Sequence, residues 1–267
     1  MQLLSTIPDS FVLPEPYYDY ELSDDTNAPI PTSLIPTLES LFDCSFLDDI
    51  DKRQHVFWKY ACQNIPYVSS HPPALDHCYA GILDRQWLLN KCMHAERTII
   101  KSIRLPFLTR RFPLQSLIPD DARVVYVIRK PWDIVHSQHE LGWYKQEHFT
   151  KMVPLFTDPL AFHTGRVCEE LNLHDSIIAT VPRANVFLLR YEDLHAEFDS
   201  KLEQLFGFVG SSLTETMRLT IKNLRTLKFA SEPIQPENLV DVSLVRSIAL
   251  TSPACPEFLQ EHYPAEL

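Results

Sequence analysis

Five apolar residues in a row, Val124–Ile128 with the sequence VVYVI, constrain the fold of this chain more than any other feature. A run this short and this uniformly apolar predicts a β-strand buried on both faces, as in a parallel sheet. Arg129 and Lys130 follow it directly, and Pro131 suits the first turn of a helix over Pro131–Leu141. A buried strand that leads straight into a helix is typical of α/β proteins.

More elements of the same two kinds occur along the chain. Further strands are predicted where apolar or β-branched residues run together, at Phe11–Leu13, Thr98–Lys101 and Val186–Leu189. Further helices are predicted over Leu34–Phe46 with Ser33 as its cap, Asp158–Leu173, Asp199–Val209 and Thr214–Asn223. This alternation predicts an α/β fold with one parallel sheet covered by helices on both faces. Ligands of such sheets bind at the carboxyl ends of the strands, so the residues after Ile128 and Leu189 are the first candidates for a site.

Arg129 stands where the buried strand ends and the next helix begins. Free N–H groups at a helix start favour phosphate, and an Arg guanidinium grips a phosphate with two parallel hydrogen bonds. Ser137, about two helical turns further on, can offer its hydroxyl to the same anion if the first turn is loose. Asp133 suits the dipole of the first turn. The alternative is a surface Arg beside an ordinary strand-to-helix turn.

Charge limits the classes of partner. The formal net charge of the 267 residues is -11, which argues against a general nucleic-acid binder. An anionic nucleotide therefore needs a local basic site rather than a basic protein.

The six cysteines show no C-x-x-C pair, so their spacing is poor for zinc, and we expect no metal. They are Cys44, Cys62, Cys78, Cys92, Cys168 and Cys255. An even count permits disulfides in a lumenal protein, and reduced core cysteines are the alternative. No apolar run approaches the ~20 residues of a membrane span, and the N-terminus does not resemble a signal peptide. From the residues alone we expect no targeting signal for the secretory pathway, so the expected location is the cytoplasm.

Three segments resemble sulfotransferases. The string RKPWDIVHS, from Arg129 to Ser137, is similar to the 3′-phosphate-binding loop of that family. Val186–Leu194 (VFLLRYEDL) and Glu203–Gly210 (EQLFGFVG) resemble a later strand with its turn and the helix after it. The resemblance implies a P-loop-NTPase-like parallel sheet flanked by helices and the donor 3′-phosphoadenosine 5′-phosphosulfate, without a metal. It makes Arg129 and Ser137 ligands of the 3′-phosphate and places Tyr191 against the adenine. The alternative is a core Tyr191 beside an Arg190–Glu192 ion pair.

Upstream segments narrow the resemblance to carbohydrate 6-O-sulfotransferases of the N-acetylglucosamine, galactose and keratan type. They are Thr98–Leu105 (TIIKSIRL), Pro8–Tyr17 (PDSFVLPEPY) and Leu41–Phe46 (LFDCSF). The resemblance implies a glycan or other carbohydrate acceptor and the Golgi lumen or membrane as location. Glu15 matches the glutamate that serves the group as catalytic base, and a solvated loop carboxylate is the alternative. Pro14 and Asp19 depart from the pattern of the group.

One family element is not found. The family grips the 5′-phosphosulfate with a loop that contains glycine and serine, but all five glycines here come at or after Gly81. We therefore expect the first strand and the phosphate loop to be missing. A fragment of a longer enzyme, a catalytically inactive relative that binds only nucleotide or glycan, and an enzyme with an unfamiliar 5′ site remain open. We expect one domain over residues 1–267, with an irregular insertion at 52–90 and a tail at 231–267; the oligomeric state stays open.

Overall fold

The computed structural model describes residues 7, 10–14, 38–45, 89–90, 92–101, 112, 118–140, 158–229 and 240–267. For residues 12–14 and 224–229 only the backbone is described. The chain divides into two compact units, one of residues 1–122 and 211–229, the other of residues 123–210 and 230–267. Each unit is described by itself. The prediction of one domain with an insertion at 52–90 stays a prediction.

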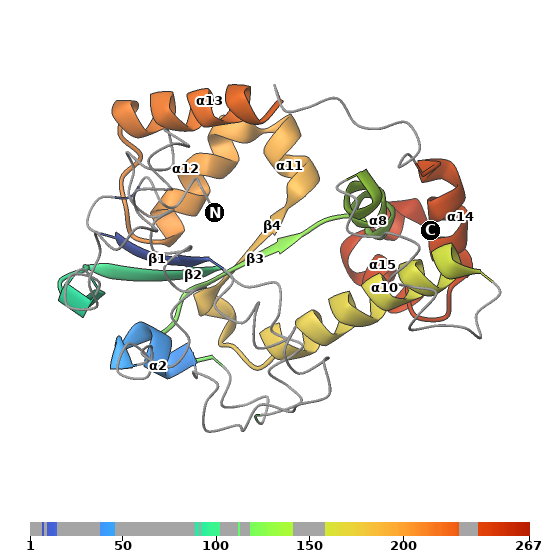
Figure 1. Ribbon diagram of the computed structural model, residues 1–267, viewed down its shortest axis with the longest axis horizontal. Coiled ribbons are helices and arrows are strands. Elements are labelled where there is room, and N and C mark those ends of the chain that lie inside the picture. The colour runs from blue at the N-terminus through green and yellow to red at the C-terminus, as the bar shows by residue number, and fades with distance from the viewer. Residues whose placement is uncertain are drawn as a thin grey trace, which may run out of the picture. The chain divides into compact units, whose positions relative to one another are not determined.

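The first unit contains a parallel pair of strands, β1 (Ser10–Pro14) and β2 (Arg97–Lys101). Ser10 pairs with Arg97 and Pro14 with Lys101, in an unbroken register (Figure 1). A short helix, α2 (Leu38–Phe42), lies within the predicted Leu34–Phe46, while Ser33 lies outside the described residues. Helix α13 (Glu215–Phe229) extends well beyond the predicted Thr214–Asn223 and buries Met217 and Ile221, four residues apart on one face.

A disulfide joins Cys44, which follows α2, to Cys92, which precedes β2. It decides between the two alternatives for these cysteines in favour of oxidation. This disulfide links the end of α2 to the residues that lead into β2 in the first unit.

The second unit contains the strand that the sequence marks most clearly. β3 (Val124–Ile128) and β4 (Val186–Arg190) form a parallel pair in which Val124 faces Val186 and Ile128 faces Arg190. The parallel direction is as predicted, and both strands therefore deliver their next residues to the same edge.

Burial on both faces is wrong for part of this pair. Val127 is 51% exposed and Leu188 44% exposed. Successive side chains of a strand point to opposite faces. Tyr126 and Ile128 point into the core of the second unit, so Val127 points to the other face, on which its register partner Leu189 is buried although Val127 itself is not.

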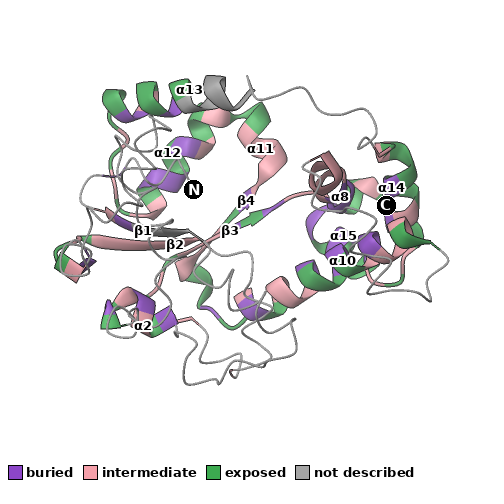
Figure 2. Cartoon of the chain, in the orientation of Figure 1, coloured by how far each residue is buried: buried purple, intermediate pink, exposed green. Residues whose placement is uncertain are grey.

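Helices gather at the carboxyl end of β3 (Figure 1). They are α8 (Pro131–Glu140), α10 (Pro159–Ile178), α14 (Val242–Thr251) and α15 (Pro256–His262), and α10 packs against the other three. Figure 2 colours the buried residues of these helices purple. The core includes Ile128, Val135 and Phe258, all fully buried. A tail that the sequence left without predicted structure thus supplies two of these helices and a final turn, η8 (Pro264–Glu266).

Local chemistry explains the helix ends. Asp158 caps α10, its carboxylate accepting from the backbone N–H groups of Leu160 and Ala161 at 3.0 Å each. Asp241 caps α14 in the same way. A disulfide between Cys168 and Cys255 joins α10 to the residue before α15. As predicted, α8 starts at Pro131.

After β4 the chain forms α11 (Tyr191–Ala196) and α12 (Phe198–Phe208), and a short turn, η6 (Arg183–Asn185), precedes β4. Gly210 has φ +72°, which a glycine adopts without strain just past a helix. There Arg123 donates to the carbonyl of Phe208 at 2.7 Å and ties the end of α12 to the start of β3.

Candidate active site

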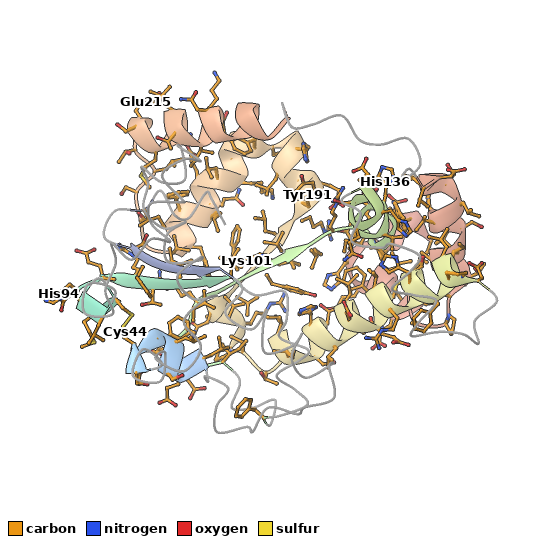
Figure 3. The ribbon with its side chains drawn as sticks, in the orientation of Figure 1. Cys44, His94, Lys101, His136, Tyr191 and Glu215 are labelled. Carbon is orange, nitrogen blue, oxygen red and sulfur yellow. A yellow bond between two sulfur atoms is a disulfide. The ribbon has the colours of Figure 1, made fainter. Side chains whose placement is uncertain are left out.

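Two predicted site residues meet at the carboxyl edge of β3 and β4. Ile128 and Arg190 face each other in the register, so Arg129 and Tyr191 are the next residues on adjacent parallel strands. The Arg129 guanidinium carbon lies 4.7 Å from the centre of the Tyr191 ring, over its face. This is a cation–π contact, and it holds both side chains at one place. Figure 3 shows Tyr191 where β4 passes into α11.

Arg129 retains an unused donor. Its Nε is buried and has no hydrogen-bond partner in the part of the chain that the structure describes. A buried N–H without a partner is costly, and an anion that accepts from it removes that cost. The alternative of an ordinary surface Arg does not explain a buried donor of this kind.

Helix α8 begins directly after Arg129. The N–H of Ile134 donates to the carbonyl of Lys130 at 3.1 Å, so the first turn is regular rather than loose. Burial raises the pKa of the Asp133 carboxyl in this turn, and the neighbouring Arg129 guanidinium opposes that shift. Asp133 therefore stands close to the cation that the site presents.

Ser137 is the seventh residue of α8 and is half-buried. It lies about 9 Å along the helix axis from Pro131. Because the first turn is regular, the loose turn on which its predicted contact depended is not present. The role of Ser137 stays a prediction that rests on the resemblance.

The two neighbours of Ser137 on α8, His136 and Gln138, both make polar contacts. His136 contacts Glu140 at 3.0 Å, and His163 of α10 contacts the Gln138 side-chain oxygen at 2.7 Å. Burial lowers the pKa of His163 to about 3, so this imidazole is neutral at physiological pH. These contacts fix the face of α8 on which Gln138 lies. Figure 3 shows His136 on this helix.

Glu192 positions the loop from the opposite side. Its carboxylate accepts from the backbone N–H of Lys130 at 3.0 Å and from the Tyr263 hydroxyl at 3.0 Å. Burial, and next the Glu192 charge, raise the pKa of Tyr263, which keeps this hydroxyl a donor. Arg190 lies over the Tyr263 ring at 5.7 Å rather than on Glu192. The alternative of a structural Arg190–Glu192 pair is therefore replaced by a Glu192–Lys130 contact.

Two other cations nearby share Glu266 as their partner. Its carboxylate accepts from the Lys130 ammonium and from the Arg246 guanidinium, the latter at 2.8 Å. Both cations also lie over the Trp132 indole, at 5.8 and 5.5 Å from its centre. We call Arg129, Lys130, Arg246 and Tyr191 the cationic cluster. Within this cluster, the buried Nε of Arg129 is the donor that has no acceptor among the described residues.

Sequence reasoning missed Tyr263, Arg246 and Glu266. All three come from the tail, which matched the family only loosely. The contact of Glu266 with Lys130 spans 136 residues of sequence, and that of Tyr263 with Glu192 spans 71. Glu192 was visible in the R-Y-E-D-L segment, but not as a partner of Lys130.

Glu15, the predicted base, lies outside the described residues. It follows Pro14, the last residue of β1, which pairs with Lys101 at the end of β2. Its role stays a prediction.

The profile of the sulfotransferase domain family matches residues 62–241, more than half of the chain. The chain belongs to the sulfotransferase family. It is a sulfotransferase-family enzyme with the α/β fold of that family, in which parallel strands are flanked by helices. Arg129, Ser137 and Tyr191 all lie inside the matched segment of this sulfotransferase.

Solved structures resemble this sulfotransferase at low sequence identity. A sulfotransferase domain from the curacin biosynthetic pathway is 15% identical, with 94% of each chain covered and a TM-score of 0.43. A sulfotransferase from Mycobacterium avium is 11% identical, with 94% of this chain and 76% of that chain covered and a TM-score of 0.38. No curated protein matches the chain. Among the described residues, no helix is long and apolar enough to cross a membrane.

Proposed function

We propose that this sulfotransferase moves a sulfonate group from 3′-phosphoadenosine 5′-phosphosulfate to a sugar hydroxyl of a glycan. One observation carries the donor half of the proposal. The buried Nε of Arg129, which has no hydrogen-bond partner among the described residues, stands at the carboxyl edge of two parallel strands, against an aromatic ring. That edge is where ligands of parallel α/β sheets bind, and a guanidinium with a free donor suits a phosphate.

The chain's residues take distinct parts in this proposal. Arg129, with Ser137, binds the 3′-phosphate, and Tyr191 lies beside the adenine. Glu192 holds the N–H of Lys130 and thereby fixes the backbone next to Arg129. Lys130 and Arg246 keep Glu266 as their partner and add positive potential around the phosphate.

The donor supplies the sulfonate group and leaves as the 3′,5′-bisphosphate. Glu15 takes the proton from the attacking sugar hydroxyl, which leaves the oxygen free to bond to sulfur. Positioning and charge stabilisation provide most of the rate of such transfers. No part of this scheme calls for a metal.

The acceptor class rests on the resemblance of TIIKSIRL, PDSFVLPEPY and LFDCSF to carbohydrate 6-O-sulfotransferases. We therefore place the acceptor among glycans of the N-acetylglucosamine, galactose and keratan type. The disulfides Cys44–Cys92 and Cys168–Cys255 support a location in the Golgi lumen, because disulfides form in oxidising compartments and are rare in the cytosol.

Two measurements test the proposal. Calorimetric titration with adenosine 3′,5′-bisphosphate should give one site, weakened at least about tenfold in Arg129→Ala, because a charge-assisted hydrogen bond contributes about 1.5–3 kcal/mol. Arg183→Ala is the matched control, since Arg183 is exposed on η6 of the same unit. Equal affinity of both variants would remove the donor assignment.

A sulfation assay with labelled donor then tests the transfer. N-acetylglucosamine-, galactose- and chondroitin-type acceptors are compared, with Glu15→Gln as the variant that should bind donor but transfer little. Binding of the bisphosphate without transfer to any acceptor would indicate a nucleotide-binding relative rather than an active enzyme.

A further inference from the structure

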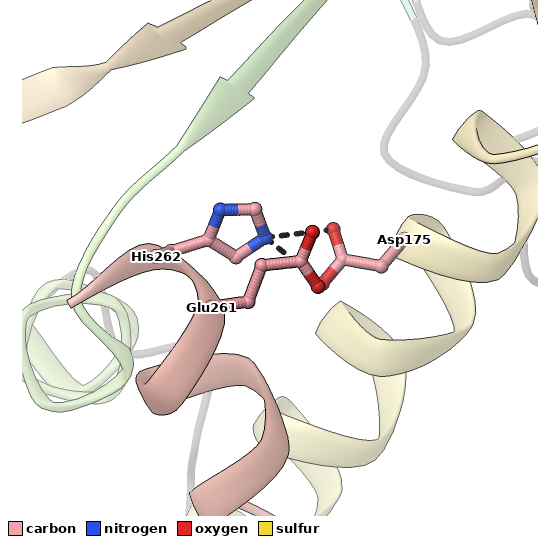
Figure 4. Close-up of side chains that lie close together, drawn as sticks. All are labelled: Asp175, Glu261 and His262. Atoms are coloured by element: carbon pink, nitrogen blue, oxygen red, sulfur yellow. Dashed lines mark hydrogen bonds and ion pairs between the residues drawn. The ribbon is translucent and has the colours of Figure 1, made fainter. Parts of the chain in front are cut away.

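A second polar cluster lies on the same unit, away from Arg129. Asp175 comes from α10, and Glu261 and His262 come from the end of α15. His262 Nε2 lies 3.0 Å from each Asp175 carboxylate oxygen (Figure 4). Each of the three residues offers one ligand atom, and these three atoms lie within 4.8 Å of one another. We call these three residues the anionic cluster.

Tyr126 of β3 adds an independent observation. It is only 9% exposed, and its hydroxyl is buried without a hydrogen-bond partner among the described residues. Its ring meets the His262 ring edge to face at 6.4 Å. The hydroxyl lies close to the Asp175 carboxylate. A buried hydroxyl that makes no hydrogen bond of ordinary geometry among the described residues therefore borders the cluster at Asp175.

The spacing of the cluster suits a small cation. Ligand atoms at 2.0–2.2 Å from a tetrahedral ion stand about 3.4 Å apart. His262 and Asp175 are now slightly closer than this, and small rotations of the side chains would admit an ion between them. The imidazole favours a first-row transition cation such as zinc over magnesium, the two carboxylates supply its charge, and a fourth position is left for water.

The scaffold holds the ligands in place beforehand. The Cys168–Cys255 disulfide lies two helical turns before Asp175 on α10 and directly before Pro256, where α15 begins. The two helices that carry the ligands are thus joined covalently close to the cluster. Tyr263, the residue after His262, donates to Glu192, which connects the cluster to the Arg129 loop.

We propose that Asp175, Glu261 and His262 bind a divalent first-row transition cation such as zinc, with the Tyr126 hydroxyl donating to a ligand or to the bound water. The ion fixes α15 onto α10 and takes no part in sulfonate transfer. The proposal is independent of the proposed function. The competing explanation is a plain histidine–aspartate pair that needs no ion.

Zinc titration by calorimetry of the full, untagged, metal-free chain tests the proposal, with melting temperature as a second readout. Wild type should bind one zinc ion and melt at a higher temperature with zinc. Glu261→Gln is the key variant, because Glu261 is exposed and its replacement leaves the fold intact. It should lose at least about tenfold in zinc affinity while its metal-free melting temperature stays that of wild type.

His195→Gln is the matched control, since His195 is exposed on α11 and outside the cluster. It should bind zinc as wild type does. Cobalt provides a spectroscopic check: wild type should show visible absorption bands of a tetrahedral site, which His262→Gln lacks. Absence of saturable zinc binding in wild type, or unchanged affinity in Glu261→Gln, would overturn the proposal. Bisphosphate binding is measured in parallel, so its failure and the failure of the metal site are told apart.

Discussion

Two polar clusters border the same strand, β3, and they differ in charge and in origin. The cationic cluster follows the strand at Arg129, and the anionic cluster lies beside Tyr126, three residues earlier. Each has one buried donor without a hydrogen-bond partner among the described residues, Arg129 Nε in the first and the Tyr126 hydroxyl in the second.

The difference lies in how the clusters are assembled. The key members of the cationic cluster, Arg129 and Tyr191, come from two strand ends, and the strand register brings them together. The anionic cluster joins two helices whose contact a disulfide fixes. Strand pairing therefore assembles the first site, whereas a disulfide and contacts between helices assemble the second. The experiments below separate these two modes of construction.

Removal of the Cys168–Cys255 disulfide should have the largest effect. Cys168→Ser with Cys255→Ser should lower the free energy of unfolding by about 2–5 kcal/mol, because the bond closes a long loop. Urea unfolding followed by tryptophan fluorescence measures it. Cys44→Ser with Cys92→Ser is the control: it should also destabilise the chain but leave the anionic cluster's zinc affinity unchanged. Unfolding curves that coincide with wild type would show that the helices meet without the bond.

Arg129→Lys should affect only the cationic cluster. Lysine keeps the charge but cannot make two parallel hydrogen bonds, so bisphosphate affinity should fall about tenfold. Calorimetry measures it, with Arg183→Lys as the control. An affinity equal to wild type would mean that the charge of residue 129 alone holds the phosphate.

Two tyrosine-to-phenylalanine variants contrast the clusters directly. Tyr263→Phe removes a hydrogen bond to the Glu192 carboxylate and should cost about 1 kcal/mol of stability. Tyr126→Phe removes a hydroxyl that makes no hydrogen bond of ordinary geometry among the described residues, so the metal-free chain should lose nothing or become more stable. The melting temperatures of both variants, measured in the presence of a chelator, test these two expectations. An equal loss in both variants would show that the Tyr126 hydroxyl is already satisfied.

The smallest effect concerns pH. Hydrogen bonding to Lys130 lowers the pKa of Glu266 below its ordinary 4.5 in the folded chain. This contribution to stability is present above pH 4.5 and is lost as the pH falls through the lowered value. Solvent screens the pair, so the loss should stay under about 1 kcal/mol. The free energy of unfolding is measured at pH 6 and at acid pH for wild type and Glu266→Gln. The difference between the two proteins should shrink on acidification. A difference that does not change with pH would show that the Glu266–Lys130 pair does not contribute.

The sequence predicted the strands well because their residues are locally decisive. Val124–Ile128 and the Pro131 start of α8 agree with the structure to the residue. Exposure of Val127 was not predictable, since it depends on tertiary packing at each position: its register partner Leu189 is buried. Of the site, Arg129 and Tyr191 were recognised as motif members, but their mutual contact follows from a register that no local pattern carries.

The rest of the site came from the tail. Tyr263 and Glu266 have no motif, and they reach Glu192 and Lys130 only after α14 and α15 fold onto α10. The anionic cluster was invisible for the same reason, because Asp175 and His262 are separated by 87 residues.

The register of β3 and β4 has a consequence for tolerated sequence change. A single-residue deletion in β4 would leave an apolar strand that still pairs with β3, yet Glu192 would take the place of Tyr191 beside Arg129. The guanidinium would then meet an internal carboxylate, and the edge would lose its attraction for phosphate. A register shift of one residue would thus be enough to abolish donor binding in a chain that still folds. Arg129 and Tyr191 would both still be present, but no longer side by side.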